Sequence, residues 1–149
     1  MILFFFGCSL LGGNYLRSIK HAEQNKSAER LRLYLQNPTH SYVREQAALS
    51  LARIPKDKQS IVHLRSCLKN THERDYVRAA CAQPLGEWKV RAADLEMISA
   101  LREVDLESAY WIAYALRKLQ TPQAIAALTE LKESPDFFIS ASSREWLGE

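Results

Sequence analysis

The chain has 149 residues, of which 47% are hydrophobic and 25% are charged, so its length and composition suit one globular domain or one short repeat array. Five glycines and five prolines are too few for a turn-rich all-β fold or for a disordered chain. The formal net charge of +3 is too small to indicate a nucleic-acid-binding protein.

The chain begins with the apolar run MILFFFGCSLLGG. The eleven residues Met1 to Leu11 are too few for a transmembrane helix, which needs about 20, and they lack the basic start of a complete signal peptide. An apolar run followed by Gly7 and Cys8 resembles the end of a bacterial lipoprotein signal, although Phe5 and Phe6 depart from the residues usual there. The resemblance implies that Cys8 is the lipid-attachment site and that the protein lies at a bacterial envelope membrane. The alternative is a cytoplasmic protein whose apolar N-terminus packs on the first helix.

These observations divide the chain at residue 27. Residues 1–27 are the apolar N-terminus, a candidate lipoprotein signal remnant, and with an anchor in place residues 9–27 would form a polar tether; residues 28–149 form a repeat domain. Residues 1–70 carry a net charge of +7 and residues 71–149 carry −4. This basic half either belongs to an ordinary dipolar surface or faces anionic lipid or an acidic partner, and it would strengthen a lipid anchor.

The rest of the chain repeats a helical pattern at intervals of 34, 31 and 31 residues. In each unit an anchor residue is followed by apolar or small residues at offsets +4, +5, +8 and +11, which lie on one stripe of a helix. The anchors are Val43, Val77, Ser108 and Ile139, and the last unit matches poorly at +5. A second apolar stripe follows each of the first three, beginning at Ile61, Leu95 and Ile125. Because Leu31 and Leu35 indicate one preceding helix, the pattern predicts an all-α row of hairpins with roughly seven helices.

Pro84 lies at offset +7 of the second unit, inside a predicted helix. Proline lacks the N–H that a helix needs, and its ring clashes with the preceding turn. We therefore expect this helix to kink or to end near Gln83, as either a structural variation or a functional bend.

In the first two units the anchor valine is followed by an arginine, Arg44 or Arg78, then by small residues, and in the second unit by Leu85-Gly86. This pattern resembles HEAT repeats, and most closely the short form associated with phycobilisome-lyase proteins. The resemblance covers about residues 28–148 and implies a short right-handed α-solenoid of about three to four helical hairpins. It also implies that Arg44 and Arg78 are architectural residues that bond across the turn of their repeat.

The polar residues predict no catalytic residue, no metal site and no cofactor. The four histidines lack metal-ligand spacing with acidic partners, and His40 and His72 fall in equivalent turns where we expect exposure. Five aspartates lie near turns or helix starts, where we expect them to cap helices. They are Asp57, Asp75, Asp94, Asp105 and Asp136. A site assembled from distant residues, as in the solenoid DNA glycosylases, is the alternative.

The three cysteines indicate neither a disulfide framework nor a zinc site, because their number is odd and their spacing does not suit a metal. Cys67 and Cys81 fall on neighbouring predicted helices in apolar surroundings. We expect both to be small buried thiols, with a bridge between them as the alternative.

The stretch SAYWIAYALRKL places three aromatic residues opposite the core stripe of the third unit, at offsets +2, +3 and +6. They are Tyr110, Trp111 and Tyr114. The equivalent residues are Glu45, Gln46 and Leu49 in the first unit and Ala79, Ala80 and Gln83 in the second. Tyr and Trp anchor protein interfaces efficiently, so the three aromatics form a candidate partner-binding site. The alternative is that adjacent repeats or a terminal segment cover this face.

The sequence therefore predicts a non-enzymatic HEAT-like adaptor or scaffold that binds another protein and is held at the bacterial envelope by a lipid on Cys8. We expect neither a nucleic-acid partner nor a small-molecule substrate. The alternative is a soluble cytoplasmic HEAT-like lyase, or an accessory subunit of a modifying enzyme.

Overall fold

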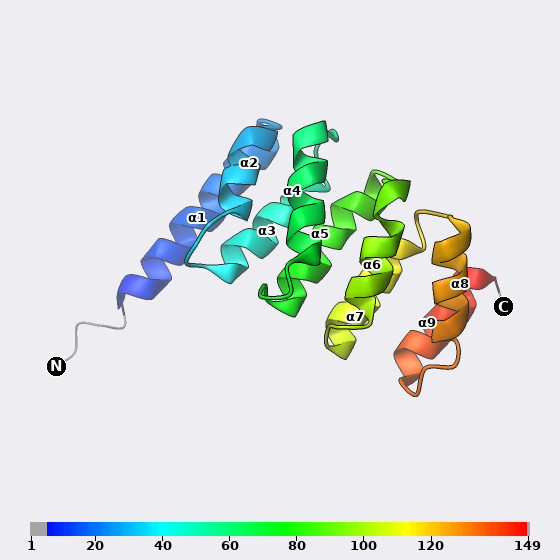
Figure 1. The fold of residues 1–149 in the computed structure, drawn as a ribbon. Coiled ribbons are helices and arrows are strands. Elements are labelled where there is room, and N and C mark those ends of the chain that lie inside the picture. The colour runs from blue at the N-terminus through cyan, green and yellow to red at the C-terminus, as the bar shows by residue number, and fades with distance from the viewer. Residues whose placement is uncertain (1–5, 149) are drawn as a thin grey trace.

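The computed structural model describes residues 6–148, with side chains from residue 13 onward. Within this part the chain forms nine α-helices, one short 3₁₀ helix and no strand (Figure 1). The helices are α1 (Phe6–Gln24), α2 (Ala28–Leu35), α3 (Ser41–Leu51), α4 (Lys58–Lys69), α5 (Asp75–Glu87), η1 (Arg91–Ala93), α6 (Asp94–Leu101), α7 (Leu106–Leu116), α8 (Pro122–Leu131) and α9 (Phe137–Leu147). The predicted all-α row of helical hairpins is confirmed, with more helices than the roughly seven expected.

The helices form two layers, which we call the odd layer (α1, α3, α5, α7 and α9) and the even layer (α2, α4, α6 and α8) (Figure 1). Successive members of the odd layer from α1 to α7 contact one another, and so do successive members of the even layer. Each hairpin therefore covers the apolar face of its neighbour, as expected of a repeat unit that cannot bury that face alone.

The core consists largely of the stripes predicted from the repeat. In the first unit Val43, Ala47, Ala48, Leu51 and Ile54 are all at most 5% exposed, and the odd-layer stripe of the third unit is equally buried. The even-layer stripes were less accurately predicted. Leu95 and Ile125, expected at their starts, are 66% and 44% exposed, because the helices are rotated so that Met97 and Ala124 turn inward instead.

Helix α1 occupies most of the segment for which we expected a polar tether. Its residues Ile19 and Ala22 are buried, and the helix contacts both α2 and α3. Tyr15 also meets Tyr34 of α2 edge-on, with ring centres 6.4 Å apart. The tether prediction is therefore wrong for this part of the chain, which completes the first hairpin. The side chain of Cys8 lies outside the described residues, so its lipid attachment stays a prediction.

Among the residues that the structure describes, no helix combines the length and the apolar character needed to cross a bilayer.

Helix α5 continues through Pro84 to Glu87, so the expected end near Gln83 is wrong. The carbonyl of Pro84 accepts a hydrogen bond from the N–H of Trp88 at 2.9 Å, which shows that helical bonding resumes directly after the proline. Helix α5 packs between α3 and α7, and Pro84 itself is fully buried. This burial offsets the roughly 3 kcal/mol that a proline costs inside a helix.

Three of the five aspartates act as predicted. Asp57, Asp105 and Asp136 cap α4, α7 and α9 by accepting a hydrogen bond from a backbone N–H three residues later. Asp94 is the first residue of α6 rather than its cap. Asp75 lies in the first turn of α5, and its carboxylate accepts a hydrogen bond from the N–H of Asp105 at 3.0 Å. That contact links α5 to the start of the next hairpin.

Candidate functional site

The three aromatic residues proposed as a partner-binding site are divided by the structure. The rings of Tyr110 and Tyr114 lie 5.7 and 6.1 Å from the ring of Trp146, and all three side chains are half-buried. These two tyrosines therefore hold α9 against α7. Trp111, in contrast, is 41% exposed. It is the member of the group that remains available to a partner, although binding there is still a prediction.

Cations from the chain itself lie over two of these rings. The guanidinium of Arg117 is 4.6 Å from the ring centre of Tyr114 and 5.5 Å from that of Trp146. The ammonium of Lys118 lies 4.8 Å from the Tyr114 ring and also pairs with Glu87. Among the described residues no cation lies over Trp111.

A groove of about 540 Å³ crosses three successive helices of the odd layer, and we call it the α3–α5–α7 groove. Helix α3 contributes Glu45 and Leu49, and helix α7 contributes Trp111 on the other side. Between them Ala79 and Ala80 of α5, each 3% exposed, form the floor. The groove exists because α5 carries two alanines where the equivalent positions of α3 and α7 carry much larger side chains.

The remaining lining residues are polar. Tyr76 and Gln83 come from α5, Glu107 and Ser108 come from α7, and Asp105 precedes α7. The hydroxyl of Tyr76, a residue 41% exposed, donates a hydrogen bond to the Oγ of Ser41 at 2.6 Å, which fixes its ring at the edge of the groove.

All the charged side chains that line the groove are acidic. Its lining includes the carboxylates of Glu45, Asp105 and Glu107 and no lysine, arginine or histidine. Burial raises the pKa of Glu45, an effect partly offset by a hydrogen bond from Gln46. No ion pair of Glu45 with a described cation is present, so this half-buried carboxylate lacks a counterion. The α3–α5–α7 groove thus combines an apolar floor, an exposed indole and an acidic rim.

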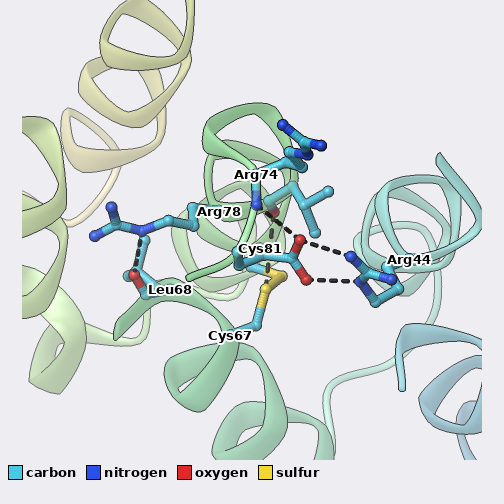
Figure 2. The surroundings of a disulfide bond; sticks show 8 residues. Arg44, Cys67, Leu68, Arg74, Arg78 and Cys81 are labelled. Carbon is cyan, nitrogen blue, oxygen red and sulfur yellow. Dashed lines mark hydrogen bonds and ion pairs between the residues drawn. A yellow bond between two sulfur atoms is a disulfide. The ribbon is translucent and has the colours of Figure 1, made fainter. Parts of the chain in front are cut away.

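Arg44 and Arg78 lie outside the groove and have the architectural role that we expected. Arg44 donates to the carbonyl of Asn37 at 2.8 Å and to both carboxylate oxygens of Glu73. Arg78 donates to the carbonyl of Leu68 at 2.9 Å (Figure 2). Arg44 thus bonds to the turn that precedes its helix, and Arg78 bonds to the last turn of α4, so both have the architectural role predicted for them.

Cys67 and Cys81 form a disulfide, with Cα atoms 6.3 Å apart (Figure 2). The expectation of two buried free thiols is therefore wrong. The bond joins α4 to α5 across the turn between them. The pairing depends on the rotation of the two helices about their axes, which their apolar surroundings in the sequence do not reveal.

No group of three or more histidine, cysteine, aspartate or glutamate side chains suited to a metal ion occurs among the described residues. His72 is exposed as expected, whereas His40 is half-buried between Tyr15 and Tyr42, with ring centres 5.6 and 5.8 Å away.

A sequence profile of HEAT repeats matches residues 61–148, which is more than half of the chain. The chain belongs to the HEAT repeat family. The matched region runs from α4 to α9 and so includes the floor of the groove and its α7 wall. HEAT repeats are commonly protein-interaction scaffolds. No curated protein matches the chain.

The HEAT units themselves contain a sequence signal for the groove. Comparison of the positions at +2 and +3 shows two alanines in the second unit between bulky or long side chains in the first and third. A small residue between two large ones on adjacent helices predicts a hollow, provided that the three helices lie side by side. Tyr76, Asp105 and Glu107 had no such signal, because they line the groove from helix starts outside the aligned offsets.

Proposed function

We propose that this chain is a non-enzymatic HEAT-repeat adaptor that binds another protein in the α3–α5–α7 groove. The observation that supports this proposal is the groove itself, with the exposed indole of Trp111 on one wall. Exposed Trp and Tyr side chains are typical energetic anchors of protein interfaces. Tyr76 and Trp111 each remain 41% exposed, so two of the aromatic side chains that line the groove are open to solvent. A segment of a partner protein suits such an open surface.

A photocrosslinking experiment tests this role. Benzoylphenylalanine at position 76 replaces one exposed aromatic ring at the groove with another, and the matched control places it at Leu95, 66% exposed on α6 in the even layer. In cells of the native host we expect a crosslinked partner from position 76 and none from position 95. The additional change Trp111→Ala should abolish the crosslink while lowering the thermal unfolding midpoint only slightly, because Trp111 is 41% exposed.

The same experiment has a control for folding. Trp146→Ala should lower the unfolding midpoint, because Trp146 packs against Tyr110 and Tyr114. The proposal would be contradicted if positions 76 and 95 gave the same crosslinks. It would also be contradicted if Trp111→Ala lost as much stability as Trp146→Ala.

We also propose that the protein is a lipoprotein attached through Cys8 to a bacterial envelope membrane. The Gly7-Cys8 pair after an apolar run supports this, as does the net charge of +7 in residues 1–70, which favours anionic lipid. The disulfide between Cys67 and Cys81 adds support, because disulfides persist in oxidising compartments such as the periplasm and are rare in the cytosol.

Metabolic labelling with an alkyne fatty acid tests the anchor. We expect label on the native chain, none on Cys8→Ala, and accumulation of the unprocessed form with globomycin. A soluble, unlabelled chain that keeps Met1 would contradict the anchor and favour a cytoplasmic accessory protein.

A further inference from the structure

We infer that the α3–α5–α7 groove receives an extended, basic segment of the partner, with a lysine or arginine side chain over the ring of Trp111 and a second basic side chain beside Glu45. This inference rests on the proposed adaptor function, because it names the chemistry of the partner that the groove accepts.

The environment of Trp111 favours a cation. Its ring meets those of Tyr110 and Tyr114 nearly at right angles, at 82° and 74°, with centres 5.3 and 6.0 Å away. These contacts hold the indole in one orientation before any partner arrives. The chain itself shows the preferred occupant, since Arg117 lies over the neighbouring rings of Tyr114 and Trp146. Trp is the aromatic side chain that attracts cations most strongly, and within the described residues its face has no cation over it.

The carboxylates of the groove favour a cation as well. Elsewhere in the chain, half-buried glutamates pair with an arginine of the adjacent repeat, as Glu73 does with Arg44 and Glu96 with Arg65. Glu45 and Glu107 have no such partner among the described residues. Because burial already raises the pKa of Glu45, an incoming cation would relieve the cost of keeping that carboxylate ionised.

The layout of the groove favours an extended chain. Glu45 and Trp111 lie on α3 and α7, with α5 between them. Packed helices are about 8–10 Å apart, so the two residues are separated by roughly 16–20 Å. An extended chain covers that distance in about six residues, and side chains six apart point to the same side. Gln83 lies on the intervening helix, and its amide can both donate to and accept from a peptide backbone.

Fluorescence anisotropy with synthetic peptides tests this inference. The probe is a fluorescein-labelled 12-residue peptide of glycine, serine and leucine with two arginines six positions apart; the comparison peptides carry glutamine or glutamate at the same two positions. We expect the arginine peptide to bind at least about ten times more tightly than the glutamine peptide, and the glutamate peptide not to bind. Added salt should weaken the binding, because the rim carboxylates are solvent-accessible.

Variants locate the binding site. Trp111→Ala should weaken binding of the arginine peptide about 3- to 30-fold, in line with a cation–π contact. Glu107→Gln, which removes the charge and keeps the shape, should weaken it about 2- to 5-fold. The matched controls Glu29→Gln on α2 and Leu95→Ala on α6 change exposed residues of the even layer and should have no effect. Circular dichroism should show a much smaller fall in the unfolding midpoint for Trp111→Ala than for Trp146→Ala, whose indole packs on both Tyr110 and Tyr114 and is half-buried.

The inference is overturned by equal affinity for the arginine and glutamine peptides, or by affinity that Trp111→Ala and Glu107→Gln leave unchanged. Sedimentation velocity adds another decisive outcome, because a dimer that Trp111→Ala dissociates would assign the groove to a second copy of the chain. If a partner crosslinks from position 76 but the arginine peptide does not bind, the basic segment is wrong and the adaptor function stands. If neither is observed, both proposals fail.

Discussion

Arg44 of α3 donates two hydrogen bonds to the carboxylate of Glu73, at 2.6 and 2.7 Å, and this bidentate pair joins two successive hairpins. One repeat later Arg78 of α5 donates to Glu103 at 2.8 Å, again in the turn before the next odd-layer helix. The pairs connect residues 29 and 25 positions apart, close to the length of one repeat. Ion pairs of this kind stabilise the packing of one hairpin on its neighbour.

Replacement of Arg44 by methionine should destabilise the chain substantially. The side chains of Arg44 and Glu73 are only 18% and 10% exposed, so the change leaves the Glu73 carboxylate in a partly dry site without its bidentate partner, with the backbone N–H of Arg74 still donating to it. We expect a loss of about 2–3 kcal/mol in the free energy of unfolding, below the roughly 3–5 kcal/mol of a fully buried pair. Urea unfolding measures it. The control is Arg53→Met, since Arg53 is 65% exposed in its pair with Glu23 and should contribute at most about 1 kcal/mol. Equal losses in the two variants would contradict the assigned role.

Glu73 should make part of the stability dependent on acid. Burial raises the pKa of Glu73, but hydrogen bonds from the Arg44 side chain and the Arg74 backbone outweigh it, and the pKa is lowered from 4.5. The unfolded state therefore binds the proton more readily. The contribution of Glu73 is present above the unfolded pKa and is lost as the pH falls through the folded pKa. Urea midpoints between pH 6 and pH 3 should accordingly fall less in Glu73→Gln than in the native chain. An acid profile of Glu73→Gln that matches the native profile would show that the Arg44–Glu73 pair does not form in solution.

Glu45 should change the stability in the opposite direction with pH. Burial raises its pKa, so its ionisation costs stability as the pH rises through the folded value. Glu45→Gln should therefore be more stable than the native chain at pH 7 and indistinguishable from it below pH 4.

Reduction of the disulfide should lower the unfolding temperature. The bond between Cys67 and Cys81 closes a loop with a sequence separation of 14, and restricting a loop of this length in the unfolded state contributes about 3 kcal/mol. Differential scanning calorimetry with and without a phosphine reductant measures the change. The variant Cys67→Ala should no longer respond to the reductant, whereas Cys8→Ser should respond as the native chain does. Three reactive thiols in denatured, unreduced protein would contradict the bond.

Gly86→Ala should separate α5 from α7. A Cβ at this position would lie 2.6 Å from the carbonyl oxygen of Ala115 and 2.9 Å from its Cα, and neither backbone atom can move without its helix. We expect a loss of about 1–3 kcal/mol by urea unfolding, as is typical of overpacking. Gly13→Ala is the control, because nothing lies within 4 Å of the added atom and a helical alanine is favoured by about 1 kcal/mol. Equal stability of the two variants would contradict the close approach.

The sequence by itself determined the order of the helices and most of the core. The stripe that begins at Val43 and the one that ends at Leu119 are buried as their spacing predicted, because side chains at those offsets lie on one face of any α-helix. The interval between units also identified Arg44 and Arg78 as equivalent residues, and in the structure each donates to a carbonyl before its own helix and to a glutamate of the next repeat.

Only the tertiary structure decided how the faces of different helices meet. The rotation of α4 and α5 brings Cys67 to Cys81, and burial on both sides carries α5 through Pro84. The approach of α9 takes Tyr110 and Tyr114 into a packed contact with Trp146 and leaves Trp111 exposed at the edge of the groove. Helical periodicity specifies the direction of each side chain about the axis of its helix. The distance and the rotation between two helices depend instead on all the contacts between them.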